Sequence, residues 1–451
     1  MIEPADRSQT PKRQARGEGS GVRVLGLPAL TGLVVASMIG AGVFTTSGYA
    51  LADLRHPGLV MLAWLIGAAV AGCGAVSYGL LARHLTENGG EYVMLARLVH
   101  PGVGFVAGWV SLLAGFTGAT AFAAVAFEAY VLPDAARPSW LPANMLAVTL
   151  IVLCTLPHTR HTTRGARLQA GAIVAKVALL VVFLGWAAAR PARWHFGSLP
   201  PAEDPTPWAL GLASAVMWVS LSFSGFNAAV YVAGEARNAG RMVPRAMALA
   251  TGLVAVIYLL LNAVFVFGPP AEAVAGRPDV AAVAAQHFGG PWLAGLVRLT
   301  VGVALATSVS SLAMAGPRVY AAMAADGLFP RRFEMRGTPP TRAIALQAAL
   351  SIVAVLLGDL RGLLGYLGLT LSLSSMATVA SLWRLRSVSA TPPGRFPWWP
   401  LAPMFYLSTT LLLALLVAWQ RPSEALAATA TLVSGAALFW VIRRETNEPK
   451  A

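Results

Sequence analysis

The chain has 451 residues, of which 57% are hydrophobic and only 12% are charged, and its formal net charge is +14. Soluble domains carry about 25% charged residues, so the composition excludes an ordinary soluble protein. Long blocks of Leu, Ala, Val and Gly exclude an outer-membrane barrel, whose strands alternate in polarity over about 10 residues. The sequence therefore predicts an all-α integral membrane protein.

Apolar runs between charged or Pro-rich loops predict about twelve transmembrane helices, called spans 1 to 12 in chain order. Their expected ranges are 27–51, 58–84, 101–127, 141–157, 167–190, 207–234, 245–268, 291–323, 339–358, 362–383, 401–420 and 423–442. Polar tails flank them at 1–24 and 444–451, and the first is expected to be disordered. No cleavable apolar segment lies close to the start, so the first span is expected to direct membrane insertion.

The distribution of basic residues predicts the orientation. An even number of spans puts both termini on one side of the membrane. Of the 33 Lys and Arg, 24 fall in segments on that side, eight fall on the other, and Lys176 lies inside span 5. Loops on the cytoplasmic side carry the excess of basic residues, so both tails are expected in the cytoplasm and the protein in the cytoplasmic membrane. Anionic lipid headgroups then account for the positive charge, without a nucleic-acid partner.

Two spans carry glycines near mid-depth. Span 1 contains Gly40-Ala41-Gly42, and span 6 contains Gly225 within "SLSFSGFNAAVYVAGEARN". Spans 1 and 6 begin two successive five-helix halves of opposite orientation, at 25–190 and 206–388, and spans 11 and 12 follow at 398–443. Gly-interrupted spans at matching positions of inverted halves indicate a transporter binding site.

The chemistry of a broken helix explains this indication. An unwound turn frees backbone N–H and C=O groups, which membrane proteins tolerate only where these groups line a cavity or meet a ligand. The N-terminus of a half-helix attracts a carboxylate, and freed carbonyls accept hydrogen bonds from an ammonium. Close packing of small residues would explain either glycine cluster alone, but the matched pair favours a site for a zwitterion.

Four segments carry a resemblance to a known family. They are "IGAGVF", "ENGGEYVML" at 87–95, "FSGFNAAVYVAGEARN" at 223–238 and "GPRVYAAMAADGLFP" at 316–330. These segments resemble motifs of the amino acid–polyamine–organocation superfamily. Span 5, "RLQAGAIVAK", is similar to the L-type amino acid transporters and related bacterial permeases, which place a lysine where Lys176 falls. The resemblance implies a leucine-transporter-like fold, a five-plus-five inverted repeat with two added helices, and alternating access around an amino acid.

The resemblance also implies the substrate-binding residues. The substrate carboxylate would meet Ala41 and Gly42, and its amino group would meet carbonyls at both breaks. The full set is Met38, Ile39, Gly40, Ala41, Gly42, Ala114, Gly115, Leu221, Phe223, Ser224, Gly225, Phe226 and Asn227.

This sequence departs from the family pattern at four places, one of which is Asn238-Ala239 in place of the Asn-Pro that ends the sixth-span motif. Ala41 stands where many relatives have serine, so recognition of the carboxylate there would depend on backbone N–H groups. Leu221 stands where an aromatic gate often lies, and Phe223 and Phe226 are the nearby alternatives. The motif of span 2 lacks its acidic residue and has Leu80 in that place.

Lys176 is the one charged residue expected deep inside a span. It lies nine residues past Arg167, about 13 Å into a core about 30 Å thick, beyond the reach of snorkelling. We expect its ammonium against the carbonyls of 38–40, with Ser310 or Ser311 close by. A sodium ion occupies this place in sodium-coupled relatives of the fold, so Lys176 would replace it. Coupling would then use protons or exchange.

The remaining polar candidates receive ordinary interpretations. Glu235 forms either an inner gate ion pair or part of a solvated interface cluster, and Glu128 and Arg298 are expected to snorkel from the outer ends of their spans. His158 and His161 are expected in a cytoplasmic loop rather than in a metal site. Three hydroxyl side chains are expected to bond back to helix carbonyls, namely Thr45, Thr46 and Ser47.

The expected function is secondary transport of an amino acid. No catalytic grouping, phosphate loop, metal cluster or cofactor fingerprint occurs in the sequence, which argues against a membrane-embedded enzyme. No acidic residue lies near mid-depth in spans 1, 3, 6, 8 or 10, so a neutral amino acid is favoured. A carrier of a polyamine or other small cation on the same fold stays open as the alternative.

Overall fold

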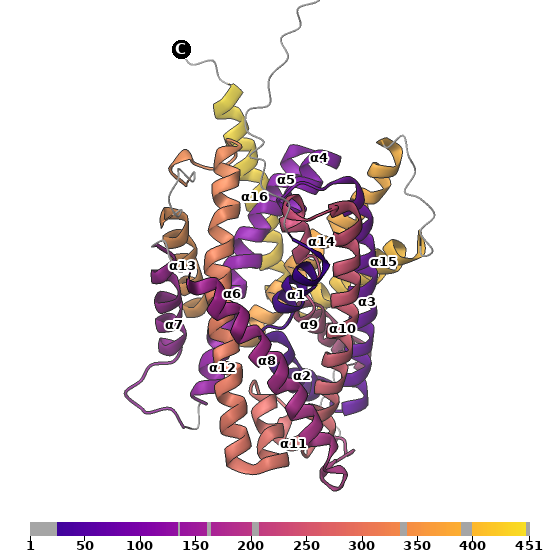
Figure 1. Ribbon diagram of the computed structural model, residues 1–451, viewed down its shortest axis with the longest axis vertical. Coiled ribbons are helices and arrows are strands. Elements are labelled where there is room, and N and C mark those ends of the chain that lie inside the picture. Colours follow the sequence, from indigo (N-terminus) through magenta and orange to yellow (C-terminus); the bar gives the residue numbers. More distant parts are fainter. Residues whose placement is uncertain are drawn as a thin grey trace, which may run out of the picture.

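The computed structural model describes residues 25–133, 136–159, 164–200, 207–333, 341–388 and 399–447. Helices fill most of this length (Figure 1). The first half contains α1 (Leu27–Met38), α2 (Gly42–Leu54), α3 (Pro57–His84), α4 (Gly90–Leu98), α5 (Pro101–Val110), η1 (Ser111–Gly118), α6 (Ala119–Val131), α7 (Met145–Thr155), η3 (Leu156–Thr159), α8 (Arg164–Ala188) and η4 (Pro191–Arg193).

The rest of the described chain again consists mainly of long apolar helices. It contains α9 (Trp208–Ser222), η5 (Ala228–Glu235), α10 (Ala239–Phe267), α11 (Ala271–Val274), α12 (Val280–Ala325), η6 (Arg331–Phe333), α13 (Thr341–Leu357), α14 (Leu360–Val388), α15 (Leu401–Gln420) and α16 (Pro422–Asn447). α12 is kinked at Gly290, whose φ of 74° is left-handed and favours glycine.

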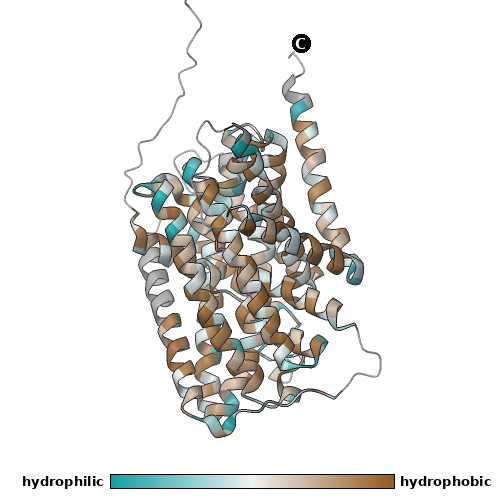
Figure 2. Ribbon diagram, turned by 90° about the vertical axis from the view of Figure 1, so that its right-hand side faces the viewer, coloured by the Kyte–Doolittle hydropathy of each residue, from teal (hydrophilic) through white to brown (hydrophobic). Residues whose placement is uncertain are grey.

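The hydropathy of the helices fits a membrane protein. Hydrophobic residues cover the length of the helices, and hydrophilic residues gather toward both ends of the molecule (Figure 2). Eight helices of the described part are long and apolar enough to span a membrane. The other four expected spans coincide wholly or partly with α7, α8, α9 and α13, whose described apolar stretches are shorter. The all-α membrane class is therefore confirmed, and the count of twelve spans stays a prediction.

The helices pack as two groups. Helices α1, α2, α3, α9 and α10 pack mainly on one another, and α6, α7, α8, α12 and α13 form the second group. α14 contacts members of both groups. In Figure 1, α7 and α13 lie on the opposite side of the molecule from α3 and α10. The two breaks belong to the first group, so its movement against the second would carry the breaks with it.

Candidate substrate site

The first break separates α1 from α2. Helical structure ends at Met38 and resumes at Gly42, and Ile39 has a non-helical ψ of 83°. The Gly40 N–H donates to the Met38 carbonyl oxygen at 2.8 Å, a tight turn in place of a helical bond. The expected break in span 1 is therefore present, and α2 begins with N–H groups that have no partner one turn earlier.

The second break follows α9. A turn covers 223–227, and the chain continues as the 3₁₀ helix η5. Gly225 has a φ of 98°, and a Cβ there would lie 2.8 Å from the Ser37 carbonyl oxygen. Glycine is required for both reasons, its left-handed backbone and the close approach of α1.

The two breaks lie side by side. A Cβ at Gly42 would lie 2.4 Å from Ser222 Oγ, and the Thr46 and Ser222 hydroxyls are 3.2 Å apart. The Tyr258 hydroxyl of α10 lies 2.6 Å from the Met38 carbonyl oxygen and 3.2 Å from that of Ser222. One hydroxyl thus bridges carbonyls from both breaks, so backbone groups of α1, α2 and α9 converge at one place.

Lys176 of α8 reaches the first break. Its ammonium donates to the Ile39 carbonyl oxygen at 2.5 Å, and the residue is 5% exposed. This carbonyl lies within the segment 38–40 that the break in span 1 and the family resemblance predict as the partner of Lys176. A buried ammonium needs such an acceptor, because desolvation of an unpaired cation is costly. The role of Lys176 in coupling stays a prediction.

Ser310 and Ser311 of α12 have other partners. The Ser310 hydroxyl lies 2.9 Å from His158 Nε2, and the Ser311 hydroxyl donates to the Thr307 carbonyl at 2.7 Å. His158 belongs to η3 and is half-buried against α12 rather than free in a loop. His161 lies outside the described residues. The expected place of the two serines beside Lys176 stays a prediction.

Ala114 and Gly115 lie in an unusual part of span 3. The segment η1 is a π-helix between α5 and α6, with Ala114 fully buried. π-Helical turns inside membrane helices frequently mark functional sites. A Cβ at Gly115 would lie 3.8 Å from Leu371 of α14, so a small residue leaves room there.

The aromatic residues of the second break point to different neighbours. Phe223 packs against Trp64 and Tyr258, with ring centroids 6.0 and 5.0 Å apart. Phe226 meets the Tyr78 ring edge-on at 5.3 Å, and Leu221 lies buried in the last turn of α9. All three line the break, and which of them gates it stays open.

Sequence reasoning missed Glu91, which contacts the predicted site residue Asn227. Asn227 Nδ2 donates to Glu91 Oε1 at 3.1 Å, and the Glu91 residue is 7% exposed. Tyr78 and Ser374 also donate to its carboxyl. Burial raises the pKa of this carboxyl above its usual value, and the hydrogen bonds from Ser374, Tyr78 and Asn227 offset only part of that rise. The quoted motif "ENGGEYVML" contained Glu91, but nothing local indicated its partners.

A second missed cluster lies at the ends of α2, α14 and α15. The Asp53 carboxylate pairs with Arg361 and, at 3.2 Å, with Arg421. Both guanidinium groups also lie over the Trp218 ring, at 5.4 and 4.8 Å from its centroid. Arg421 pairs further with Glu424 at 3.3 Å. This group, called the Asp53 cluster, links the end of span 1 to spans 10, 11 and 12.

The snorkelling expected for Glu128 and Arg298 is wrong. Glu128 is 3% exposed and accepts from Arg137 at 2.8 Å and from the N–H groups of Asn144 and Ala147. These donors, from the segment that begins α7, satisfy its charge inside the protein.

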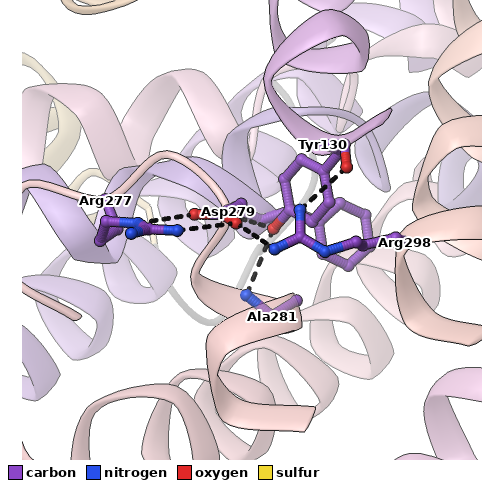
Figure 3. A network of polar contacts seen from close by, with 6 residues as sticks. Tyr130, Arg277, Asp279, Ala281 and Arg298 are labelled. Carbon is purple, nitrogen blue, oxygen red and sulfur yellow. Dashed lines mark hydrogen bonds and ion pairs between the residues drawn. The ribbon is translucent and has the colours of Figure 1, made fainter. Parts of the chain in front are cut away.

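Arg298 is held in the same way. It donates to Asp279 at 2.7 Å and to the Tyr130 carbonyl at 3.0 Å (Figure 3). The Tyr130 hydroxyl in turn donates to the Phe44 carbonyl at 2.6 Å, near the start of α2. The network thus anchors the first turn of α2 against α6 and α12.

The expectations for the small polar residues hold in part. Thr45 bonds back to the Ala41 carbonyl at 3.1 Å as expected. Thr46 instead meets Ser222, and Ser47 donates to Asn262 Oδ1 at 2.5 Å, so that two of the three hydroxyls join neighbouring helices. Glu235 is exposed and forms no ion pair with any residue that the structure describes, which fits the solvated alternative.

A cavity of about 440 Å³ opens between the end of α3 and the start of α10, away from both breaks. Arg83, Arg241 and Arg245 line it together with Gly240, Pro244 and Ala248. It contains none of the predicted substrate residues. Within the described ranges, no group of His, Cys, Asp and Glu is arranged to hold a metal ion.

Comparison with known proteins gives a consistent result. The family model for amino acid permeases matches residues 25–442. The large neutral amino acids transporter small subunit 2 of Rattus norvegicus is 22% identical over 98% of this chain and 85% of its own length. An uncharacterized transporter of Mycobacterium tuberculosis is 30% identical over 76% of each chain. The branched-chain amino acid permease BcaP of Lactococcus lactis is 26% identical over 72% of this chain and 73% of its own.

Proposed function

The chain belongs to the amino acid permease family, and on this premise we propose that it carries a neutral amino acid across the cytoplasmic membrane by alternating access. The transport is secondary and independent of sodium, driven by protons or by exchange. The family and the similar transporters support an amino acid as the small-molecule substrate.

The observation that carries this proposal is the juxtaposition of the two breaks. The start of α2 at Gly42 contacts Ser222 at the end of α9. The substrate carboxylate binds the N–H groups at Ala41 and Gly42, where the helix dipole favours an anion. The substrate ammonium binds carbonyls of the two breaks, each of which has a second lone pair available.

Lys176 supports independence from sodium. Its ammonium donates a hydrogen bond to the Ile39 carbonyl oxygen at 2.5 Å. A fixed positive charge therefore offsets the negative ends of the carbonyl dipoles at the first break. A sodium ion there would meet like charge at close range, which is unfavourable in a poorly solvated site.

The hydrogen bonds that the two buried charged residues already form support a neutral substrate. Glu91 lies near the second break, where the sequence argument had found no acidic residue, but its carboxyl already accepts three hydrogen bonds. Lys176 is likewise engaged with Ile39. Neither charge is left to pair with a charged substrate side chain. The names of two relatives, for large neutral and for branched-chain amino acids, agree with this.

Uptake by purified protein in liposomes tests the proposal. Labelled neutral, acidic and basic amino acids and a polyamine are offered across imposed pH and sodium gradients. We expect uptake of a neutral amino acid that is unchanged when choline replaces sodium. Transport of the polyamine alone, or failure of every amino acid to be transported or to raise thermal stability, would contradict the substrate class.

A further inference from the structure

Glu91 is a buried carboxyl at a junction of four segments. Its Oε1 accepts from the Tyr78 hydroxyl of α3 at 2.5 Å and from Asn227 Nδ2, in the turn after α9, at 3.1 Å. Its Oε2 accepts from the Ser374 hydroxyl of α14 at 2.6 Å. No Lys or Arg among the described residues forms an ion pair with it, so hydrogen bonds alone satisfy the carboxyl.

The chemistry of a carboxylate fixes the orientation of the Asn227 amide. An ionised carboxylate only accepts hydrogen bonds, whereas an amide carries one donor group and one acceptor group. Asn227 must therefore turn Nδ2 toward Glu91, and Oδ1 of the same planar amide faces away from it. Within the described part of the chain, no hydrogen bond to this Oδ1 is formed. Asn227 is also only half-buried, and it is the last residue of the turn that forms the second break.

We propose that Glu91 is a positioning residue that makes Asn227 present an acceptor oxygen to the transported molecule. This inference rests on the proposed function, because it places the substrate at the second break. The α-ammonium of an amino acid only donates hydrogen bonds, so it fits Oδ1 and is repelled by a reversed amide. An α-hydroxyl group donates and accepts, so it tolerates either orientation. Glu91 therefore contributes to the selection of α-amino acids over α-hydroxy acids of the same shape.

The variant Glu91→Gln tests this role. The introduced amide can donate to Asn227 Oδ1, which lets the Asn227 amide reverse. In liposomes, inhibition of labelled leucine uptake is measured with unlabelled leucine and with 2-hydroxy-4-methylpentanoate, its α-hydroxy analogue. We expect the inhibition constant of leucine to rise about tenfold, the effect of one lost charged hydrogen bond, and that of the analogue to change less. The ratio of the analogue's inhibition constant to that of leucine is therefore expected to fall. An unchanged ratio would overturn the inference.

Ser374→Ala is the matched control. It removes a donor to the same carboxyl and leaves the bond between Glu91 and Asn227 in place. We expect lower thermal stability but the wild-type ratio of inhibition constants. A shift in the ratio as large as that of Glu91→Gln would show that Glu91 acts only through packing, and the positioning role would be rejected.

A polarity swap provides the rescue. In the double variant Glu91→Gln with Asn227→Asp, the introduced glutamine donates to the introduced aspartate, whose second oxygen still accepts from the substrate. We expect the ratio to return to the wild-type value or beyond. The double variant also carries the test if Glu91→Gln alone does not fold, and a ratio far below the wild-type value then counts against the inference. If the wild-type protein transports another neutral amino acid but not leucine, the same comparison uses that amino acid and its α-hydroxy analogue, whereas failure of every amino acid to be transported would instead contradict the proposed function.

Discussion

At the scale of single residues, Gly42 is the position where the site tolerates least change. A Cβ there would lie 2.4 Å from Ser222 Oγ and 2.8 Å from Ser222 Cα, so a methyl group must push α2 and α9 apart. Overpacking of this kind costs about 1–3 kcal/mol. The N–H groups proposed to bind the carboxylate belong to the same turn, so binding and packing depend on one glycine.

We predict that Gly42→Ala lowers the apparent affinity for the transported amino acid at least tenfold and lowers the melting temperature. The control is Gly32→Ala in α1, where no heavy atom lies within 4 Å of the added Cβ. Alanine favours a helix by about 0.5–1 kcal/mol over glycine, so the control is expected to be equally or more stable and fully active. Uptake kinetics and thermal unfolding in detergent measure both. Normal affinity in Gly42→Ala would remove α2 from the proposed carboxylate site.

Lys176 and Tyr258 allow charge to be separated from hydrogen bonding at the first break. Lys176→Ala removes an ammonium from the Ile39 carbonyl, whereas Tyr258→Phe removes a neutral hydroxyl from the adjacent Met38 carbonyl. Hydrogen bonds with a charged partner contribute about 1.5–3 kcal/mol, roughly twice as much as neutral ones. We predict that Lys176→Ala reduces the initial rate of uptake at least tenfold and Tyr258→Phe reduces it less. Wild-type uptake by Lys176→Ala would exclude the coupling role.

The residues of the site divide by whether local sequence could indicate them. The breaks were predictable, because glycine at mid-depth in an apolar helix is costly and needs a reason. The depth of Lys176 indicated that it needs a partner, and the break in span 1 together with the family resemblance indicated which carbonyls could supply one. Glu91 was missed because its hydrogen bond to Ser374 joins residues 283 positions apart, and one sequence contains no signal for such a pairing. Snorkelling of Glu128 was wrong because depth counted along a helix ignores the neighbouring chain, which here supplies its donors.

At the scale of elements, the Asp53 cluster holds the end of α2 against α14 and the start of α16. Asp53 is 16% exposed in its side chain and accepts from two arginines, both of which also stack on Trp218 of α9. Removing the carboxylate charge leaves two partly buried guanidinium groups without their shared acceptor. The cluster therefore links α2, α9, α14 and the start of α16 at the end opposite the predicted cytoplasmic tails.

We predict that Asp53→Asn lowers the free energy of unfolding by about 1–3 kcal/mol and reduces transport, because closure at this end weakens. The control is Glu87→Gln, whose ion pair with Arg97 is 3.2 Å long but more than half exposed on both sides. Such exposed pairs contribute about 0–1 kcal/mol, so the control is expected to resemble wild type. Thermal unfolding at low and high salt distinguishes the two. Equal effects of both variants would show that the cluster is no more than a surface ion pair.

The π-helix η1 is an element that no pattern in the sequence predicted. The range 101–127 was expected as one regular helix, and the observed helical stretch runs from Pro101 to Val131 with a π-helical insert. Its residues, "SLLAGFTG", show no pattern that distinguishes them from an ordinary apolar helix. Within η1, Gly115 faces α14, where a Cβ would lie 3.8 Å from Leu371.

At the scale of the whole molecule, α14 contacts both helix groups and takes part in both missed networks. Arg361 at one end of α14 binds Asp53 of α2, and Ser374 farther along binds Glu91 of α4. Alternating access requires that only one end of a transporter opens at a time. The two polar contacts of α14, Arg361 with Asp53 and Ser374 with Glu91, are called its two ties. They are suited to that requirement, since each contact can break while the other stays formed.

We predict that the two ties oppose each other in transport kinetics. Asp53→Asn is expected to favour opening at its end, and Glu91→Gln opening at the other, so each single variant slows the cycle. The double variant is expected to be less impaired than the product of the single effects. The measurement is a double-mutant cycle of initial uptake rates for the wild type, the two single variants and the double variant. Multiplicative effects would show that the two contacts of α14 act independently.

The proposed recognition surface at the first break consists of peptide groups, chiefly the carbonyls of Met38 and Ile39 and the N–H groups that begin α2. Alanine scanning removes side chains and would leave every one of these groups in place, so a conventional scan would report this region as inert. Replacing single amides by esters, which deletes one N–H and weakens one carbonyl, is the chemical change that addresses such a surface. For the same reason, substrate preference is expected to change when the side chains around the breaks are substituted. The backbone would still bind the carboxylate and ammonium groups, which all amino acids share.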